Sequence, residues 1–133
     1  VVALEKVAAE KVERYGIVGG TPMGDALYLI STLIEKPKAS EAPSDLAIAS
    51  RYAFSPRIFD YIDRTSPGKN GEIQLTDAMA QMIGQQPFNA VTFDGKRYDC
   101  GSKVGYIEAN LALALQRPDM AEQVRAIALN LLK

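Results

Sequence analysis

Short apolar runs along the chain are typical of β-strands. In residues 27–34 both alternating faces are largely apolar, as expected of a strand that is covered on each side. The other runs are shorter and contain the β-branched and aromatic residues that favour extended structure. The predicted strands are residues 1–4, 15–18, 27–34, 46–54 and 88–93.

Helices are predicted where apolar residues recur at intervals of three and four positions. Residues 8–14 have the composition for one or two helical turns. Ser55-Pro56 suits the start of a short helix, and Thr76 suits the N-cap of another, within residues 71–78 that we interpret as structural. Two further stripes, separated by Pro118, indicate two final helices. The stripe positions are Ile58, Phe59 and Ile62, then Met79, Met82 and Ile83, then Val104, Ile107, Leu111 and Leu115, and finally Met120, Val124, Ile127 and Leu131.

Glycine, proline and polar residues separate these elements. Residues 19–25 contain three glycines and a proline, which predicts a surface loop. Residues 38–44 and 65–71 are also expected to be loops, and Asp94-Gly95 is a hairpin-type turn. Strands that alternate with helices before a helical end indicate an α/β architecture with a mixed sheet. Because no glycine-rich phosphate loop accompanies the strands, most of any nucleotide cradle must lie outside this chain.

Composition and charge narrow the range of functions. The chain has 133 residues, of which 47% are apolar, and a formal net charge of -1. It therefore reads as one soluble globular domain that can bury a core. The near-neutral charge offers no excess of cations for phosphates, so we expect no nucleic-acid partner. No run approaches about 18 apolar residues and no secretory signal is evident, so we expect no membrane contact and a cytoplasmic location.

The chain lacks the residues of several common catalytic sites. It has no histidine, and Cys100 is its only cysteine. A disulfide framework, a zinc knuckle and a Ser-His or Cys-His pair are therefore excluded from this chain. We interpret Cys100 as a small packed residue, because no histidine can activate its thiol. The remaining chemistry must use carboxylates, lysines and backbone groups.

The first candidate site is Glu35-Lys36-Pro37, at the end of an apolar strand where an α/β sheet normally opens to its ligand. A carboxylate can accept two sugar hydroxyls, and a lysine ammonium group can pair with a phosphate. The alternative is a solvated strand end before a loop. These three residues alone leave both interpretations open.

The second candidate is residues 98–106, in which an acid and two glycines lie between a strand and a helix. Asp99 could supply a hard oxygen to Mg²⁺, and Gly101 would let the backbone approach a ligand closely. Alternatively, Asp99 or Ser102 simply caps the helix. Because caps are far commoner than metal ligands, the chemistry alone favours the cap.

Five segments, taken together and in order, carry a resemblance to a known family. They are Arg14-Tyr15-Gly16-Ile17-Val18, Leu33-Ile34-Glu35-Lys36-Pro37-Lys38, Ala42-Pro43-Ser44-Asp45-Leu46-Ala47, residues 71–78 and residues 98–106. Jointly they closely resemble the bacterial UTP:glucose-1-phosphate uridylyltransferases, or UDP-glucose pyrophosphorylases. The resemblance runs from about Val1 to Leu115 and covers only the carboxyl-terminal half of such an enzyme.

This resemblance implies a sugar-nucleotidyltransferase fold, a Rossmann-like mixed sheet that is incomplete here, with carboxyl-terminal helices. It implies transfer of a uridylyl group from UTP to glucose 1-phosphate, which gives UDP-glucose and pyrophosphate with the help of Mg²⁺. By resemblance, Glu35 holds glucose hydroxyls and Lys36 is the catalytic residue that holds phosphates. Gly16 would offer its backbone to the sugar, and Asp99 would lie at the metal. A phosphoryl transition state needs such charges beside it and no covalent nucleophile.

The front half of the family has no counterpart in this sequence, which begins with Val rather than Met. We therefore expect a fragment, with the sheet and sugar-phosphate site in residues 1–100 and helices in residues 101–133, that is inactive by itself. A sheet cut through its middle exposes an unpaired edge and apolar surface, so we also expect a homo-oligomer.

Two alternatives remain open. One is a non-catalytic regulatory or assembly module in which the motifs have no function. The other is a glucose-1-phosphate thymidylyltransferase-like enzyme. That family's acidic loop usually reads Asp-Thr-Gly-Thr, whereas this chain has Asp99-Cys100-Gly101-Ser102.

Overall fold

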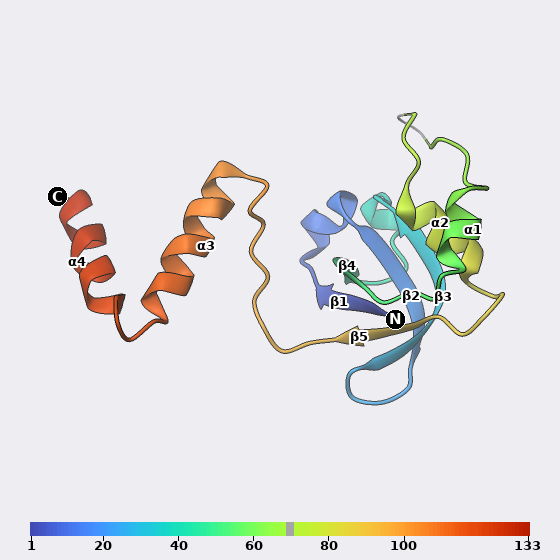
Figure 1. Cartoon of the computed structure of the whole chain (residues 1–133), viewed down its shortest axis with the longest axis horizontal. Coiled ribbons are helices and arrows are strands. Elements are labelled where there is room, and N and C mark those ends of the chain that lie inside the picture. The colour runs from blue at the N-terminus through green and yellow to red at the C-terminus, as the bar shows by residue number, and fades with distance from the viewer. Residues whose placement is uncertain (69–70) are drawn as a thin grey trace. The chain divides into compact units, whose positions relative to one another are not determined.

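A computed structural model describes residues 1–68 and 71–133, so residues 69–70 of the expected loop 65–71 lie outside the described part. The chain forms two compact units, Val1–Asp94 and Gly95–Lys133 (Figure 1). The first unit contains strands β1 (Val2–Lys6), β2 (Gly16–Pro22), β3 (Leu27–Glu35), β4 (Leu46–Tyr52) and β5 (Asn89–Thr92), 3-10 helices η1 (Ala9–Arg14) and η2 (Ala39–Glu41), and helices α1 (Ile58–Ile62) and α2 (Leu75–Met82). The second contains α3 (Lys103–Leu115) and α4 (Ala121–Leu131).

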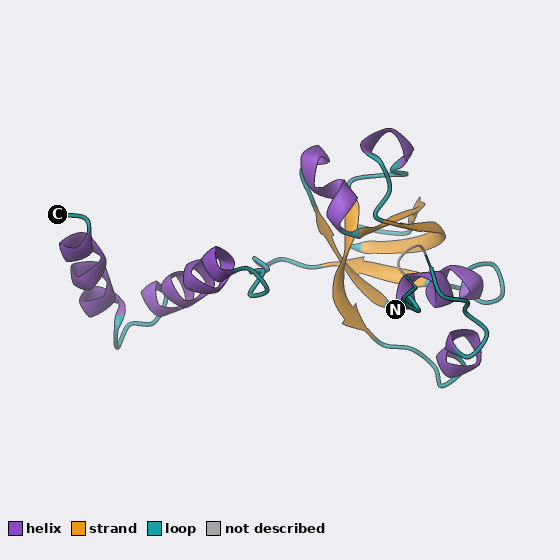
Figure 2. Ribbon diagram, turned by 90° about the horizontal axis from the view of Figure 1, so that it is seen from above, coloured by secondary structure: helices purple, strands orange, loops and turns teal. Residues whose placement is uncertain are grey.

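The five strands form one mixed sheet in the order β1-β4-β2-β3-β5, coloured orange in Figure 2. β1 and β5 run parallel, and every other pairing among these five strands is antiparallel. The expected α/β class with a mixed sheet is confirmed. The expected unpaired edge is wrong for the described residues, because pairing of β5 with β1 closes the sheet and gives each strand two neighbours.

The loop expected at residues 19–25 is also wrong in part, because β2 continues to Pro22, which lies opposite Tyr28 of β3. The glycines serve close strand packing here. A Cβ at Gly20 would collide with the carbonyl oxygen of Leu29, and one at Gly19 would lie 2.7 Å from a methyl group of Thr32. The register shifts between the two glycines, and the chain turns only after Pro22.

The core of the first unit lies between the sheet and the two short helices. Met79 and Met82 of α2 are buried as their spacing predicted, together with Ile58 of α1, whereas Phe59 is exposed. α2 contacts β3 through this core. The buried methionines therefore fix the start of α2 beside the end of β3, where the first candidate site lies.

The second unit consists of helices whose apolar positions are mostly exposed. α3 begins with Ser102 as its N-cap, and the Ser102 hydroxyl accepts a hydrogen bond from the N–H of Gly105 at 3.0 Å. Among the described residues of α3 and α4 only Ala109 is buried. No helix in the described part of the chain is long and apolar enough to cross a membrane.

Candidate functional site

Strand pairing brings Gly16 and Glu35 together. Gly16 is the first residue of β2, Glu35 is the last of β3, and the two are partners in the antiparallel ladder. A Cβ at Gly16 would lie 3.1 Å from Oε2 of Glu35, which is closer than such atoms normally approach. The absent side chain therefore leaves room for the Glu35 carboxylate at the end of the sheet.

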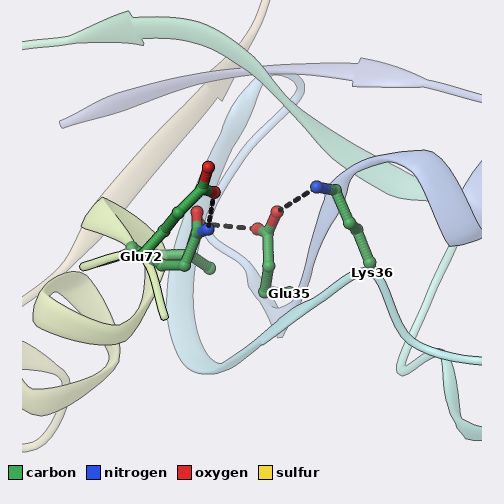
Figure 3. Close-up of polar contacts among 5 residues, drawn as sticks. Glu35, Lys36 and Glu72 are labelled. Carbon is green, nitrogen blue, oxygen red and sulfur yellow. Dashed lines mark hydrogen bonds and ion pairs between the residues drawn. The ribbon is translucent and has the colours of Figure 1, made fainter. Parts of the chain in front are cut away.

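Lys36 follows β3 directly and has a left-handed backbone, with φ of 45°. Its N–H donates to the carbonyl oxygen of Tyr15 at 3.0 Å, which holds this conformation beside β2. Its Nζ lies 3.7 Å from Oε1 of Glu35 (Figure 3). Because the Lys36 side chain is 54% exposed and that of Glu35 is 24% exposed, solvent screens the pair and the ammonium group can still meet a phosphate.

Thr76 is a site residue that the sequence did not reveal. We expected it to cap α2, but the N-cap is Gln74, and Thr76 lies within the first turn. Its Oγ1 donates a hydrogen bond of 2.7 Å to Oε2 of Glu35, which is 41 positions away. A local pattern indicates a capping threonine equally well, so only the long-range packing of α2 against β3 shows this role.

A pocket of about 590 Å³ opens at this point of the first unit. Its polar groups are two carboxylates, one ammonium group and one amide, which suits a ligand rich in hydroxyl groups with an anionic end. Figure 3 shows Lys36 on one side of the Glu35 carboxylate and Glu72 on the other. The lining residues are Leu33, Ile34, Glu35, Lys36, Gly68, Gln74 and Asp77. Residues 71–78, interpreted from sequence as structural, therefore supply part of the pocket wall.

Asp99 belongs to the second unit and is exposed. Its Oδ1 accepts a hydrogen bond from the N–H of Gly101 at 3.0 Å, and Ser102 is the helix cap. Nearby, the Glu108 carboxylate lies 2.7 Å from Nζ of Lys96 and raises the pKa of that lysine. The structure thus brings Gly16, Glu35 and Lys36 together. The described contacts of Asp99 are with its own near neighbours in the second unit.

The described acidic residues can supply only part of the coordination shell of Mg²⁺. No group of three or more Asp, Glu or Cys side chains that could hold a metal ion occurs among the described residues. Mg²⁺ commonly takes one or two protein carboxylates and completes its shell with water and substrate phosphates, and one exposed carboxylate such as Asp99 fits that pattern. Cys100 is exposed, so our interpretation of it as packed is wrong.

The fold is a mixed sheet with a polar pocket at the end of β3, and comparison with known proteins shows the family to which the chain belongs. A family model described as nucleotidyl transferase matches residues 1–116. The chain belongs to this nucleotidyl transferase family, and the fold class expected from the sequence resemblance is confirmed.

Individual relatives show which members of this family the chain is similar to. A UTP--glucose-1-phosphate uridylyltransferase of Pseudomonas aeruginosa is 48% identical over 109 residues, which cover 82% of this chain and 39% of the relative. One from Staphylococcus epidermidis is 37% identical over 126 residues, which cover 95% of this chain and 44% of the relative. The chain therefore spans less than half the length of these relatives.

Solved structures agree with the sequence relatives. The crystal structure of a UDP-glucose pyrophosphorylase complexed with UDP-glucose has a TM-score of 0.82 and 46% identity, covering 87% of this chain and 44% of that chain. A UTP-bound enzyme of the same kind from Acinetobacter baumannii also has a TM-score of 0.82, with 31% identity, covering 96% of this chain and 44% of that chain. The resemblance to UDP-glucose pyrophosphorylases is thus confirmed by sequence and by fold.

Proposed function

We propose that this chain is part of a longer UTP:glucose-1-phosphate uridylyltransferase and carries the sugar-phosphate side of its active site. The observation that carries the proposal is the pocket at the end of β3, where Glu35 is held by Thr76 and stands beside the exposed Lys36. The names of the relatives support the choice of UTP and glucose 1-phosphate as substrates.

The side chains suit the two ends of glucose 1-phosphate. The Glu35 carboxylate accepts hydrogen bonds from glucose hydroxyls, and the backbone of Gly16 lines the same strand end. The ammonium group of Lys36 pairs with the phosphates of the substrate and of the sugar nucleotide. A phosphate oxygen of glucose 1-phosphate attacks the α-phosphorus of UTP, the bond between the α- and β-phosphates breaks, and pyrophosphate leaves. Lys36 stabilises the charge that develops, so the reaction needs no covalent nucleophile.

In the complete site, Asp99 would bind Mg²⁺ through a carboxylate oxygen. Bound Mg²⁺ would neutralise the phosphate charge during the transfer. The UTP-binding groups would come from the part of the enzyme beyond this chain. The 133-residue chain is therefore expected to bind sugar phosphates without making UDP-glucose.

We also propose that the protein assembles as a homo-oligomer. The closed sheet removes the unpaired edge as a reason, but the leucines and isoleucines of α3 and α4 still expose apolar surface. Sedimentation at micromolar concentration is expected to show a dimer or larger species. A monodisperse monomer would contradict this part of the proposal.

The catalytic proposal is tested in the full-length protein that contains this sequence. Lys36→Met and Glu35→Gln are compared with Lys38→Met and Glu41→Gln, which make the same substitutions at exposed residues outside the pocket lining. Formation of UDP-glucose from UTP and glucose 1-phosphate with Mg²⁺ is expected to lose about 100-fold in kcat/KM with Lys36→Met.

Glu35→Gln is expected to act mainly on KM for glucose 1-phosphate, because it weakens hydroxyl binding. Both controls should retain activity. Unchanged activity in both pocket variants would favour a regulatory or assembly module. A preference for dTTP over UTP would favour a thymidylyltransferase.

A further inference from the structure

We propose that Thr76 is a positioning residue that fixes the Glu35 carboxylate in the orientation needed to receive sugar hydroxyls. This inference rests on the proposed function of Glu35 and extends it to a residue that does not line the pocket. The Thr76 hydroxyl donates a hydrogen bond to Oε2 of Glu35. The distance of 2.7 Å between the two oxygen atoms is short, as is typical of a charge-assisted hydrogen bond.

Thr76 is held rigidly enough to act in this way. It lies in the first turn of α2, and the same helix buries Met79 and Met82 almost completely in the core. Fixed backbone and packed neighbours restrict where the hydroxyl can point. The donor is therefore supplied by a packed helix, whereas Glu35 itself is the last residue of its strand.

Gly16 completes the arrangement from the other side. A Cβ at that position would lie 3.1 Å from Oε2 of Glu35 and 3.4 Å from the methyl group of Thr76. The space left by glycine is the space in which the carboxylate and the threonine meet. Two elements, β2 and α2, thus define where Oε2 lies.

Without Thr76, the carboxylate would be left with Lys36, whose Nζ lies 3.7 Å from Oε1. An exposed ion pair with a flexible lysine holds a side chain weakly and in several geometries. A carboxylate drawn fully onto Lys36 would also neutralise the cation that a phosphate requires. Thr76 therefore keeps the two roles apart, with Glu35 for the sugar and Lys36 for the phosphate.

Thr76 contributes little to the stability of α2 itself. Gln74 is the N-cap of α2 and makes no side-chain cap hydrogen bond, and Thr76 does not replace it. Threonine is also a poorer helix former than alanine or leucine. A hydroxyl in the first turn that bonds to a residue 41 positions away is best explained by its tertiary partner.

The first test needs no ligand. Thr76→Val keeps the shape of the side chain and removes the hydroxyl, Thr76→Ser keeps the hydroxyl, and Thr32→Val is a matched control at an exposed position of β3. Three-bond NMR couplings of Glu35 in this chain are expected to report one rotamer in the unsubstituted, Thr76→Ser and Thr32→Val proteins. Rotamer averaging is expected only in Thr76→Val, and retention of the single rotamer there would overturn the proposal.

The second test is a double-mutant cycle on binding of UDP-glucose, measured by calorimetry. Thr76→Val should weaken binding about tenfold in the unsubstituted chain, and should have no further effect when Glu35→Ala is already present. An equal loss in both backgrounds would mean that Thr76 acts independently of Glu35 and would overturn the inference.

A different result would count against the proposed function instead. If Glu35→Ala leaves UDP-glucose binding unchanged, or if the unsubstituted chain binds none, the sugar-phosphate role of Glu35 in this chain is contradicted. The ligand-free couplings then decide whether Thr76 positions Glu35 at all.

Discussion

The two units of the chain both carry patterns of apolar residues but bury them very differently. In Val1–Asp94 the sheet and two short helices share a core in which Leu4 and Met79 are fully buried. In Gly95–Lys133 the apolar stripes of α3 and α4 remain largely exposed. A helical pattern therefore predicts that a helix forms, but it does not say what covers the apolar face.

The same difference governs how well each unit fixes its polar groups. Glu35 is placed by strand pairing with Gly16 and by a hydrogen bond from a helix packed on the core. The described contacts of Asp99 are hydrogen bonds to its near neighbours Gly101 and Ser102. A pre-formed half-site is therefore expected in the first unit.

The largest expected effect tests the contrast in burial directly. Leu4→Ala removes a side chain with no exposure, whereas Leu131→Ala removes one that is 82% exposed. Leu4→Ala should lower the free energy of unfolding by about 3 kcal/mol, because it leaves a cavity in a packed core. Leu131→Ala should change it by less than about 0.5 kcal/mol. Urea unfolding followed by amide NMR signals from each unit checks both values.

A comparable loss for Leu131→Ala would break the comparison. It would mean that Leu131 itself is covered in solution and lies in the interface of the proposed homo-oligomer. Repeating the measurement at lower protein concentration would then reduce that loss, because dilution dissociates the oligomer.

A smaller effect is expected where the strands approach most closely. Gly20→Ala places a Cβ against the backbone of Leu29 and Ile30, and should destabilise the first unit by about 2 kcal/mol. Gly24→Ala is the matched control, since nothing lies within 4 Å of its added Cβ. Thermal unfolding of the two variants should separate them clearly. Equal stability would show that the sheet is looser than the structure indicates.

The left-handed backbone at Lys36 gives a third contrast. Lys36→Gly and Lys36→Ala both remove the ammonium group, but only glycine adopts φ of 45° without cost. The glycine variant should therefore be more stable than the alanine variant by about 1 kcal/mol in urea unfolding. Both should lose affinity for sugar phosphates. Identical stabilities would argue against a left-handed Lys36 in solution.

The smallest effect concerns pH in the second unit. Arg117 donates two hydrogen bonds to the Asp119 carboxylate, at 3.0 and 2.7 Å, and thereby lowers the pKa of Asp119. A lowered pKa in the folded state means that the pair stabilises α4 above the ordinary carboxyl pKa of about 4 and loses this effect as the pH falls further.

Amide hydrogen exchange at the start of α4 should therefore become slightly faster as the pH falls below the ordinary carboxyl pKa, after correction for intrinsic exchange rates. Asp119→Asn should abolish this step. Because both side chains are exposed, added salt should weaken it in the unsubstituted chain. A step of equal size in Asp119→Asn would assign it to another group.

The sequence predicted the individual strands and helices better than it predicted how the strands pair to close the sheet. Apolar runs located β1, β3 and β4, and the spacing of Met79 and Met82 identified the buried face of α2. Pairing of β1 with β5 joins segments far apart in the chain, and no local pattern encodes it. Gly19 and Gly20 were misread because glycine serves tight strand packing as well as turns.

The candidate site, like the fold, was predictable only in part from the sequence. Glu35 and Lys36 stand at the end of an apolar strand, which is where a sheet meets its ligand. The contact of Thr76 with Glu35 was missed because a threonine at a helix start has a sufficient local explanation as a cap. The roles of Gly16, Glu35, Lys36 and Asp99 toward substrate and metal stay predictions.

The central claim is that the first unit holds a folded half-site for a sugar phosphate. A backbone-amide NMR titration of this chain with glucose 1-phosphate and with UDP-glucose, each with and without Mg²⁺, tests it most directly. The account predicts saturable shifts that cluster at Gly16, Glu35, Lys36 and Thr76. A well-dispersed spectrum in which these amides do not move would contradict it.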